Sequence, residues 1–215
     1  MKKITLIFTA IIAIACFFAC TNRPLPNIEG TEDATTIDNL KTAITGESDA
    51  SAKYAKISEQ ALAQGQHGIA AMFAAASAAE AVHVQNHTAV LNELGEGIEV
   101  IPDVEINENL EENIQAAIDG ETYEYTEMYP PMIERANKEN LIDAVKTFTY
   151  AKKAEENHAR LYTEALELLK AGRGAEIATT WYVCPLCGNL FNTLDGYEMC
   201  GICGERKHAF IAFEK

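Results

Sequence analysis

Residues 79–83 read AEAVH, and residues 154–158, which lie 75 positions further along, read AEENH. A second pair of similar segments precedes this one: AITGE at residues 43–47 recurs 74 positions later as AIDGE at residues 117–121. Each half of the repeat therefore carries a Gly-Glu pair followed by Glu-x-x-His. Self-similarity at a nearly fixed offset indicates a duplicated structural unit.

The segments that carry the repeat are rich in Ala, Glu, Leu, Ile and Lys, with helical periodicity and almost no strand signal. We expect a kink in the third helix at Pro130-Pro131, and a connection containing Pro102 that is long enough to cross a bundle. Two helix pairs joined by one long crossover predict an all-α, ferritin-like four-helix bundle over residues 35–172. The expected helices cover residues 36–64, 69–94, 107–137 and 139–169.

The repeated residues have the chemistry of a metal site. In Glu-x-x-His the two side chains lie on adjacent turns of one helical face. A Glu from each of two helices, with Glu-x-x-His from each of the other two, is the donor set of a carboxylate-bridged dinuclear centre. The alternative is a solvated acidic face, which the matched repeat disfavours, and inward-facing carboxylates repel one another unless cations neutralise them. The predicted donors are Glu47, Glu80, His83, Glu121, Glu155 and His158.

The repeat is broken at Glu124, which shares a helical face with Glu121 and corresponds to Ala50 in the first half. One half of the site thus has a carboxylate that its symmetry mate lacks. An additional carboxylate allows an iron to exchange ligands when its charge changes, so we expect a catalytic role for Glu124.

Three further side chains follow the predicted ligands at helical spacing. Tyr54 and Tyr129 come about two turns after the glutamates of the first helix in each pair, and we expect their phenols to point at the metal site. Core packing is the alternative for both tyrosines. His87 comes four residues after His83, and we expect it at the surface or behind the ligands.

The C-terminal region contains two C-x-x-C pairs separated by twelve residues. Each pair forms a tight knuckle around one metal, with Gly188 and Gly204 allowing the backbone to turn. Four thiolates suit tetrahedral iron or zinc, of which iron would transfer single electrons and zinc would be structural. Disulfide pairing is the competing interpretation. After a linker at residues 173–180, we therefore predict a small metal-binding domain over residues 181–215, with ligands Cys184, Cys187, Cys200 and Cys203.

The N-terminus has the pattern of an export signal. Lys2 and Lys3 precede sixteen largely apolar residues, a run that is short for a membrane span of about 20 residues. Residues 17–20 read FFAC and resemble a lipobox, with Cys16 as a weaker second candidate for lipidation. We expect a signal peptide over residues 1–20, lipidation at Cys20 and a flexible tether over residues 21–34. These features predict an exported, membrane-anchored lipoprotein facing the periplasm or another extracytoplasmic space.

Composition limits the remaining classes. The chain has 215 residues, a net charge of −15 and only 17 basic residues. Because affinity for nucleic acid comes from neutralising phosphates, this acid excess argues against a nucleic-acid partner.

Taken together, these motifs resemble the rubrerythrin family over about residues 35–215. The segments that carry the resemblance are residues 46–48, 80–83, 120–124, 128–130 and 154–158, with the two cysteine knuckles. The resemblance implies two non-haem irons bridged by Glu80 and Glu155, and a rubredoxin-like domain holding one iron. Glu124 and His83 would be alternative ligands between which the first iron moves on oxidation and reduction. The remaining ligands would be Glu47 on the first iron, and Glu121 with His158 on the second.

The resemblance also implies a function. Rubrerythrins are peroxidases that reduce hydrogen peroxide to water in oxidative-stress defence, with electrons relayed singly through the rubredoxin-like iron. A homodimer is implied, in which that domain commonly serves the neighbouring subunit, together with a separate redox donor protein. The alternative is a ferroxidase that sequesters iron, as ferritins do, with a structural C-terminal metal site. Because a signal peptide is atypical of the family, the donor of electrons stays open.

Overall fold

The computed structural model describes residues 34–215. The expected signal peptide, the lipidation site at Cys20 and nearly all of the expected tether lie outside the described residues. Within residues 34–215, no helix is both long and apolar enough to cross a membrane.

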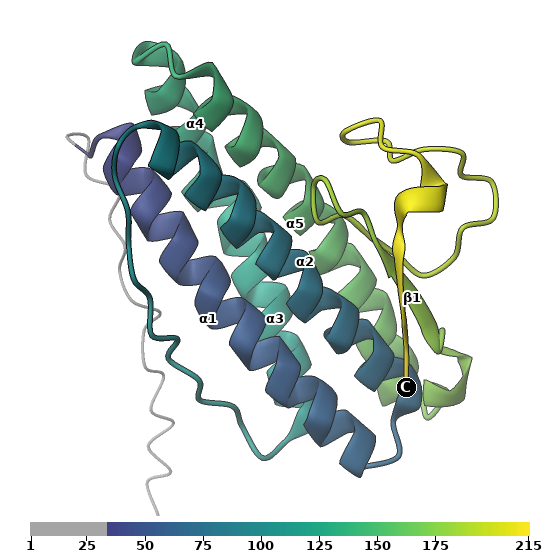
Figure 1. Cartoon of the computed structure of the whole chain (residues 1–215). Helices are drawn as coiled ribbons and strands as arrows, with labels where there is room; N and C mark the ends of the chain where they lie inside the picture. Colours follow the sequence, from purple (N-terminus) through teal and green to yellow (C-terminus); the bar gives the residue numbers. More distant parts are fainter. Residues whose placement is uncertain (1–33) are drawn as a thin grey trace, which may run out of the picture.

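Four long helical segments form an antiparallel bundle (Figure 1). Its first hairpin begins with a capping box in which Thr35 and Asp38 satisfy each other's backbone N–H groups. The connection after this hairpin runs along the length of the bundle beside α1, where Lys56 donates a hydrogen bond to the carbonyl oxygen of Val104. This crossover gives the predicted ferritin-like topology. The helices of the bundle are α1 (Thr36–Ala63), α2 (His67–Glu93), α3 (Leu110–Tyr123), α4 (Tyr129–Lys138) and α5 (Ile142–Lys170).

The third helical segment differs from the continuous helix expected from the sequence. A π-helical stretch, Glu124–Met128, separates α3 from α4, and Pro130 and Pro131 occupy the first turn of α4. Pro130 and Pro131 have no N–H to donate to the carbonyl groups of the preceding turn. The N–H of Tyr129, just before them, bonds to the carbonyl oxygen of Glu124, five residues back, which is the spacing of a π-helix. The π turn holds one extra residue, which explains why the repeat offset is 74 before it and 75 after it.

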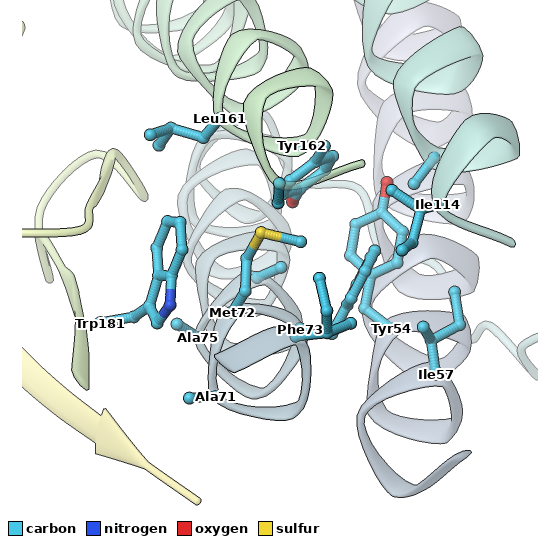
Figure 2. Packing of buried hydrophobic residues seen from close by; sticks show 14 of the residues in the cluster. Tyr54, Ile57, Ala71, Met72, Phe73, Ala75, Ile114, Leu161, Tyr162 and Trp181 are labelled. Atoms are coloured by element: carbon cyan, nitrogen blue, oxygen red, sulfur yellow. The ribbon is translucent and has the colours of Figure 1, made fainter. Parts of the chain in front are cut away.

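Small side chains let the helices approach closely. Helix α2 buries five alanines and packs against α1, α5 and the C-terminal strands, and larger side chains fill the space between these elements. Figure 2 shows Tyr54, Phe73 and Tyr162 in contact beside Met72, with Trp181 of the C-terminal region on the other side of Met72. The bundle and the C-terminal region therefore share one hydrophobic core.

The C-terminal region is a small antiparallel sheet with strand order β2-β1-β3. Its central strand pairs with both neighbours, and Trp181 on this strand is buried against the bundle. The first cysteine-bearing turn lies against α2 and α5, where its carbonyl oxygens accept hydrogen bonds from His83, Asn86 and His158. The elements are β1 (Thr180–Val183), β2 (Leu190–Phe191) and β3 (Ile211–Glu214), with short 3₁₀ turns at Gly174–Glu176 and Lys207–Ala209.

Candidate metal centre

The bundle brings six predicted donors to one buried point, and each is at most 2% exposed. They form two groups of four whose ligand atoms lie within 4.8 Å of one another. Glu80 and Glu155 belong to both groups, so their carboxylates lie between two metal positions. The first group adds Glu47 and His83, and the second adds Glu121 and His158.

The distances show how closely the imidazoles and carboxylates converge. Nδ1 of His83 lies 2.9 Å from Glu80 and 2.8 Å from Glu155. Nδ1 of His158 lies 2.7 Å from Glu155 and 3.4 Å from Glu80. The two imidazoles are stacked, with ring centres 6.0 Å apart, so each faces its own side of the carboxylate pair.

These atoms converge without satisfying one another, which is the observation that tests whether metals fit. Nδ1 of both histidines, both oxygens of Glu80 and Glu155 and one oxygen of Glu47 are buried with no hydrogen-bond partner. Buried polar atoms are nearly always paired, so a cluster of lone pairs aimed at one point requires cations. Carboxylate and imidazole donors in this number suit two divalent ions such as ferrous iron.

Electrostatics lead to the same conclusion. Without bound cations, burial and then the charge of Glu155 raise the pKa of Glu47 to about 8. Burial and neighbouring carboxylates likewise raise the pKa of Glu121. Burial opposes protonation of His83, but the carboxylate of Glu155 outweighs it and raises the pKa of the imidazole. A metal that replaces these protons removes the repulsion among the carboxylates.

The two predicted tyrosines lie against site carboxylates on opposite sides. Tyr54 donates a hydrogen bond of 2.6 Å to Glu121, and Tyr129 donates one to Glu47. Each phenol thus fixes the orientation of a carboxylate that faces the metals. His87 is fully buried behind Tyr129 and is not a surface residue.

Glu124 lies beside the site but outside both groups of four. It is the first residue of the π-helical stretch, and its side chain is partly buried. Burial and the charges of Glu47 and Glu121 raise the pKa of its carboxyl. The structure thus places an additional carboxylate next to the first metal position, where His83, and not Glu124, is one of the four converging donors.

The four cysteines form a second cluster. Their sulfur atoms lie within 4.8 Å of one another, with 3.4 Å between Cys184 and Cys203 and 3.5 Å between Cys187 and Cys200. A disulfide would require about 2.05 Å, whereas sulfurs around one tetrahedral metal lie almost 4 Å apart. All four thiols are free, so the structure favours a metal site over the disulfide alternative.

The first cysteine knuckle sits directly on the dinuclear site. Nε2–H of His83 donates to the carbonyl oxygen of Cys187 (3.0 Å), and Nε2–H of His158 donates to that of Gly188 (3.1 Å). These bonds fix the tautomer in which Nδ1 carries the lone pair that a metal requires. Gly188 has a φ of 76°, and a Cβ there would lie 2.2 Å from Nε2 of His83, so only glycine allows this approach.

Sequence reasoning missed the residues that hold the knuckle in place. Asn86 donates to the carbonyl oxygen of Leu186, and Asn157 donates to Asn189 and to the carbonyl oxygen of Leu190. Asn157 lies inside the second Glu-x-x-His motif and Asn86 lies one turn after the first. The sequence did offer one signal for these two residues, because each asparagine lies close to a predicted histidine ligand.

The knuckle packs on the bundle of its own chain, whereas the family resemblance implies that it serves a neighbouring subunit. The linker itself packs against the same bundle. Ile177 is buried in the bundle core, and its backbone lies so close to Gly68 on α2 that a Cβ at Gly68 would be 2.7 Å from the carbonyl oxygen of Ile177. The linker is thus attached to the end of the bundle before the sheet begins.

A four-helix bundle with this donor set defines a carboxylate-bridged di-metal protein of the ferritin-like class, here with an added four-cysteine module. The family model for rubrerythrin matches residues 38–166. The chain is 38% identical to Rubrerythrin-2 of Clostridium acetobutylicum over 184 residues, which cover 85% of this chain and 98% of that protein. It therefore belongs to the rubrerythrin family.

Two further comparisons concern nigerythrin. The chain is 36% identical to nigerythrin of Nitratidesulfovibrio vulgaris over 180 residues, covering 83% of this chain and 86% of that protein. The structure of nigerythrin in its fully reduced, all-ferrous state superposes with a TM-score of 0.78 at 32% identity, over 95% of this chain and all of that chain. The site is thus a diiron centre of this family, accompanied by a four-cysteine metal site.

Proposed function

We propose that this protein is a non-haem diiron peroxidase that reduces hydrogen peroxide to water and receives its electrons through an iron at the four-cysteine site. The observation that carries the proposal is the contact between the two sites. Both histidines of the diiron centre donate hydrogen bonds to consecutive carbonyl groups of a knuckle whose thiolates hold the second metal. An iron store needs no electron donor built onto its ligands, so this contact favours reduction of a substrate over sequestration.

The residues around the diiron centre have different roles in the proposed reaction. When bound, the two ferrous irons supply the two electrons that cleave the O–O bond of peroxide. Glu80 and Glu155, which belong to both groups of donors, would bind both irons, and Glu124 would provide a carboxylate that can replace His83 at the first iron. Tyr54 and Tyr129 hold the terminal carboxylates in place. The apolar core on both sides of the centre limits the entry of water.

The reaction with oxidants tests the activity. Fully reduced protein would be mixed anaerobically with hydrogen peroxide or with dioxygen, and oxidation of the diiron centre followed by stopped-flow absorbance. A peroxidase reacts much faster with peroxide than with dioxygen. Equal or reversed rates would support the ferroxidase alternative.

The identity of the second metal is tested independently. We propose iron at the four-cysteine site because a one-electron carrier is useful at this contact and zinc would have only a structural role. Metal analysis and visible spectra of air-oxidised protein distinguish the two, because only ferric iron gives thiolate charge-transfer absorption. Zinc without this absorption would contradict the electron relay.

We further propose a homodimer, as is typical of rubrerythrins, in which each chain carries the contact described above. Light scattering of the full-length mature protein at several concentrations tests the dimer, and a monomer at all of them would contradict it.

We also propose export, with lipidation at Cys20 anchoring the protein to a membrane on its extracytoplasmic side. The supporting pattern is the basic and apolar start of the chain followed by FFAC at residues 17–20. Several acyl chains on one cysteine would give stable anchoring, whereas one chain binds weakly. Mass spectrometry of the mature N-terminus tests this, and an unmodified first residue other than Cys20 would contradict it.

A further inference from the structure

We propose that Thr147, His87 and Tyr129 form a proton relay that leads from a surface cavity to Glu47 at the diiron centre. The inference rests on the proposed peroxidase function, because reduction of peroxide consumes protons. Each link crosses to another helix: Thr147 lies on α5, His87 on α2, Tyr129 at the start of α4 and Glu47 on α1.

The links are direct hydrogen bonds between buried side chains. Oγ1 of Thr147 lies 3.0 Å from Nδ1 of His87, and Nε2 of His87 lies 3.1 Å from the phenol oxygen of Tyr129. The phenol in turn donates to Glu47. His87 and Tyr129 are fully buried, and Phe148 packs against both rings, so the chain is shielded from water along its middle.

The donors all point in one direction. Because the single proton of Tyr129 is given to Glu47, its oxygen must accept from His87, and Nε2 of that ring therefore carries a proton. Burial lowers the pKa of His87 to about 3, so the ring is neutral and its Nδ1 accepts from Thr147. Every O–H and N–H in the chain thus points toward the metal site.

The outer end of the chain reaches solvent. Thr147 is 6% exposed and lines a surface cavity of about 180 Å³ between α2, α5 and the first cysteine knuckle. Asp143, Lys146 and Asn86 supply polar groups at its wall. Water in this cavity can therefore give a proton to Thr147 as Thr147 passes its own inward.

The internal repeat offers a comparison within the same molecule. Tyr129 corresponds to Tyr54 at the offset of 75, and both phenols donate to a site carboxylate. On the Tyr54 side, however, the positions of His87 and Thr147 are taken by Tyr162 and Met72. Tyr54 packs edge-on against Tyr162 and lies in an apolar cluster that includes Met72. The polar chain has therefore been built on one side of a duplicated architecture.

The proposed step is balanced. Reduction of one hydrogen peroxide breaks the O–O bond, takes two electrons from the two ferrous irons and two protons from solvent, and yields two waters. For each proton that enters at Thr147, one passes from Thr147 to His87, one from His87 to Tyr129 and one from Tyr129 to Glu47. Glu47 then gives one proton to a peroxide oxygen, so its carboxylate ends as it began. No member of the chain holds a net charge, and the starting polarity is restored before each further proton enters, when the hydroxyl groups rotate and His87 exchanges its ring proton.

The first test is spectroscopic and needs no activity. Nitrogen NMR of the full-length protein loaded with zinc, which is diamagnetic, reports the tautomer of each imidazole, and a His87→Gln spectrum identifies the signals of His87. We expect a neutral ring with the proton on Nε2 from about pH 5 to pH 8. In Thr147→Val, the Nδ1 signal should shift as its hydrogen bond is lost. A proton on Nδ1, or a charged ring at neutral pH, would overturn the relay.

The second test is kinetic and uses the iron-loaded protein. In Thr147→Val, oxidation of the reduced centre by peroxide should slow by at least about tenfold. This loss is smaller than the full rate enhancement that a positioned proton-transfer group contributes to catalysis. Its solvent isotope effect should rise, and Thr147→Ser, which keeps the hydroxyl, should restore the rate. Thr149→Val is the matched control, because the Thr149 hydroxyl donates to the carbonyl oxygen of Val145 on its own helix and is not part of the chain that leads to Glu47.

The two proposals fail in different ways. If wild-type protein does not reduce peroxide, the proposed function fails, and the tautomer of His87 still decides the relay. If wild-type protein reduces peroxide but Thr147→Val matches Thr149→Val in rate and isotope effect, the relay is wrong and the peroxidase stands.

Discussion

Substitution of Gly188 by alanine tests whether contact between the two metal sites has a measurable energy. Gly188 has a positive φ of 76°, and its backbone rests on the ligand His83. Gly204 is the matched control because it has the same place in the second knuckle and a φ of 79°, but a Cβ there meets no atom within 4 Å. The two variants share the backbone strain and differ only in the clash.

The magnitude follows from these contacts. A non-glycine residue in the left-handed region costs about 1–2 kcal/mol, which applies to both variants. At Gly188 the new Cβ would also lie 2.2 Å from Nε2 of His83 and 2.9 Å from the carbonyl oxygen of Ala79, well inside ordinary contact. Relief requires the knuckle to withdraw, which breaks the bonds from His83 and His158 at about 1 kcal/mol each. Gly188→Ala should therefore cost about 2 kcal/mol more than Gly204→Ala.

Chemical denaturation of the iron-loaded protein measures this difference. Trp181 is the only tryptophan and is buried between the sheet and the bundle, so its fluorescence reports their separation. If the four-cysteine site holds iron and relays electrons as proposed, the rate of electron transfer from it to the oxidised diiron centre gives a second readout, which should fall only in Gly188→Ala. Equal losses of stability and equal transfer rates in the two variants would show that the contact contributes nothing.

Three other predictions concern the metals. Glu124→Ala should retain two irons, since the groups of four are complete without it, but lower peroxide turnover by about tenfold or more; loss of iron would make Glu124 an assembly ligand. Cys200→Ser should remove ferric–thiolate absorption and leave the diiron content unchanged, and loss of both would show that the bundle depends on the module. Metal-free protein should lose stability as pH rises from about 4.5 to 8, because burial raises the pKa of Glu47 to about 8 when folded, while the unfolded chain releases this proton near 4.5. The slope is up to about 1.4 kcal/mol per pH unit, and iron should abolish it, as denaturation at several pH values will show.

The bundle was predictable because its signals are local and repeated. Periodicity and glycine breaks placed α1 within one residue of both its observed ends, Thr36 and Ala63. The π-helical stretch was not predicted, although the change of offset from 74 to 75 between the two pairs of similar segments already recorded one extra residue. Locating that residue required the backbone, because the neighbouring prolines fit either a kinked α-helix or a π turn.

The contact between the two metal sites was harder to predict because it uses backbone groups. The acceptors are the carbonyl oxygens of Cys187 and Gly188, and every residue has such a group. Gly188 carries a signal, but the knuckle turn alone explains that glycine. The burial of Ile177 against the end of α2 decides that the module packs on its own bundle, and this is a long-range contact that the linker's composition does not encode.

The internal repeat separates two kinds of information about the site. Where the halves agree, as at Glu80 and Glu155, they supply the donors that hold two metals in nearly equivalent surroundings. Symmetry of this kind cannot by itself decide which iron changes ligands or from which side protons arrive. The halves differ at Glu124, whose mate is Ala50, and at His87, whose mate is Tyr162. Both polar members of these pairs lie on the side of the site next to Glu47. We therefore expect ligand exchange and proton supply at the same iron, the one next to Glu47. A change in the charge of that iron would drive the ligand exchange, and the arrival of a proton would compensate the same change in charge.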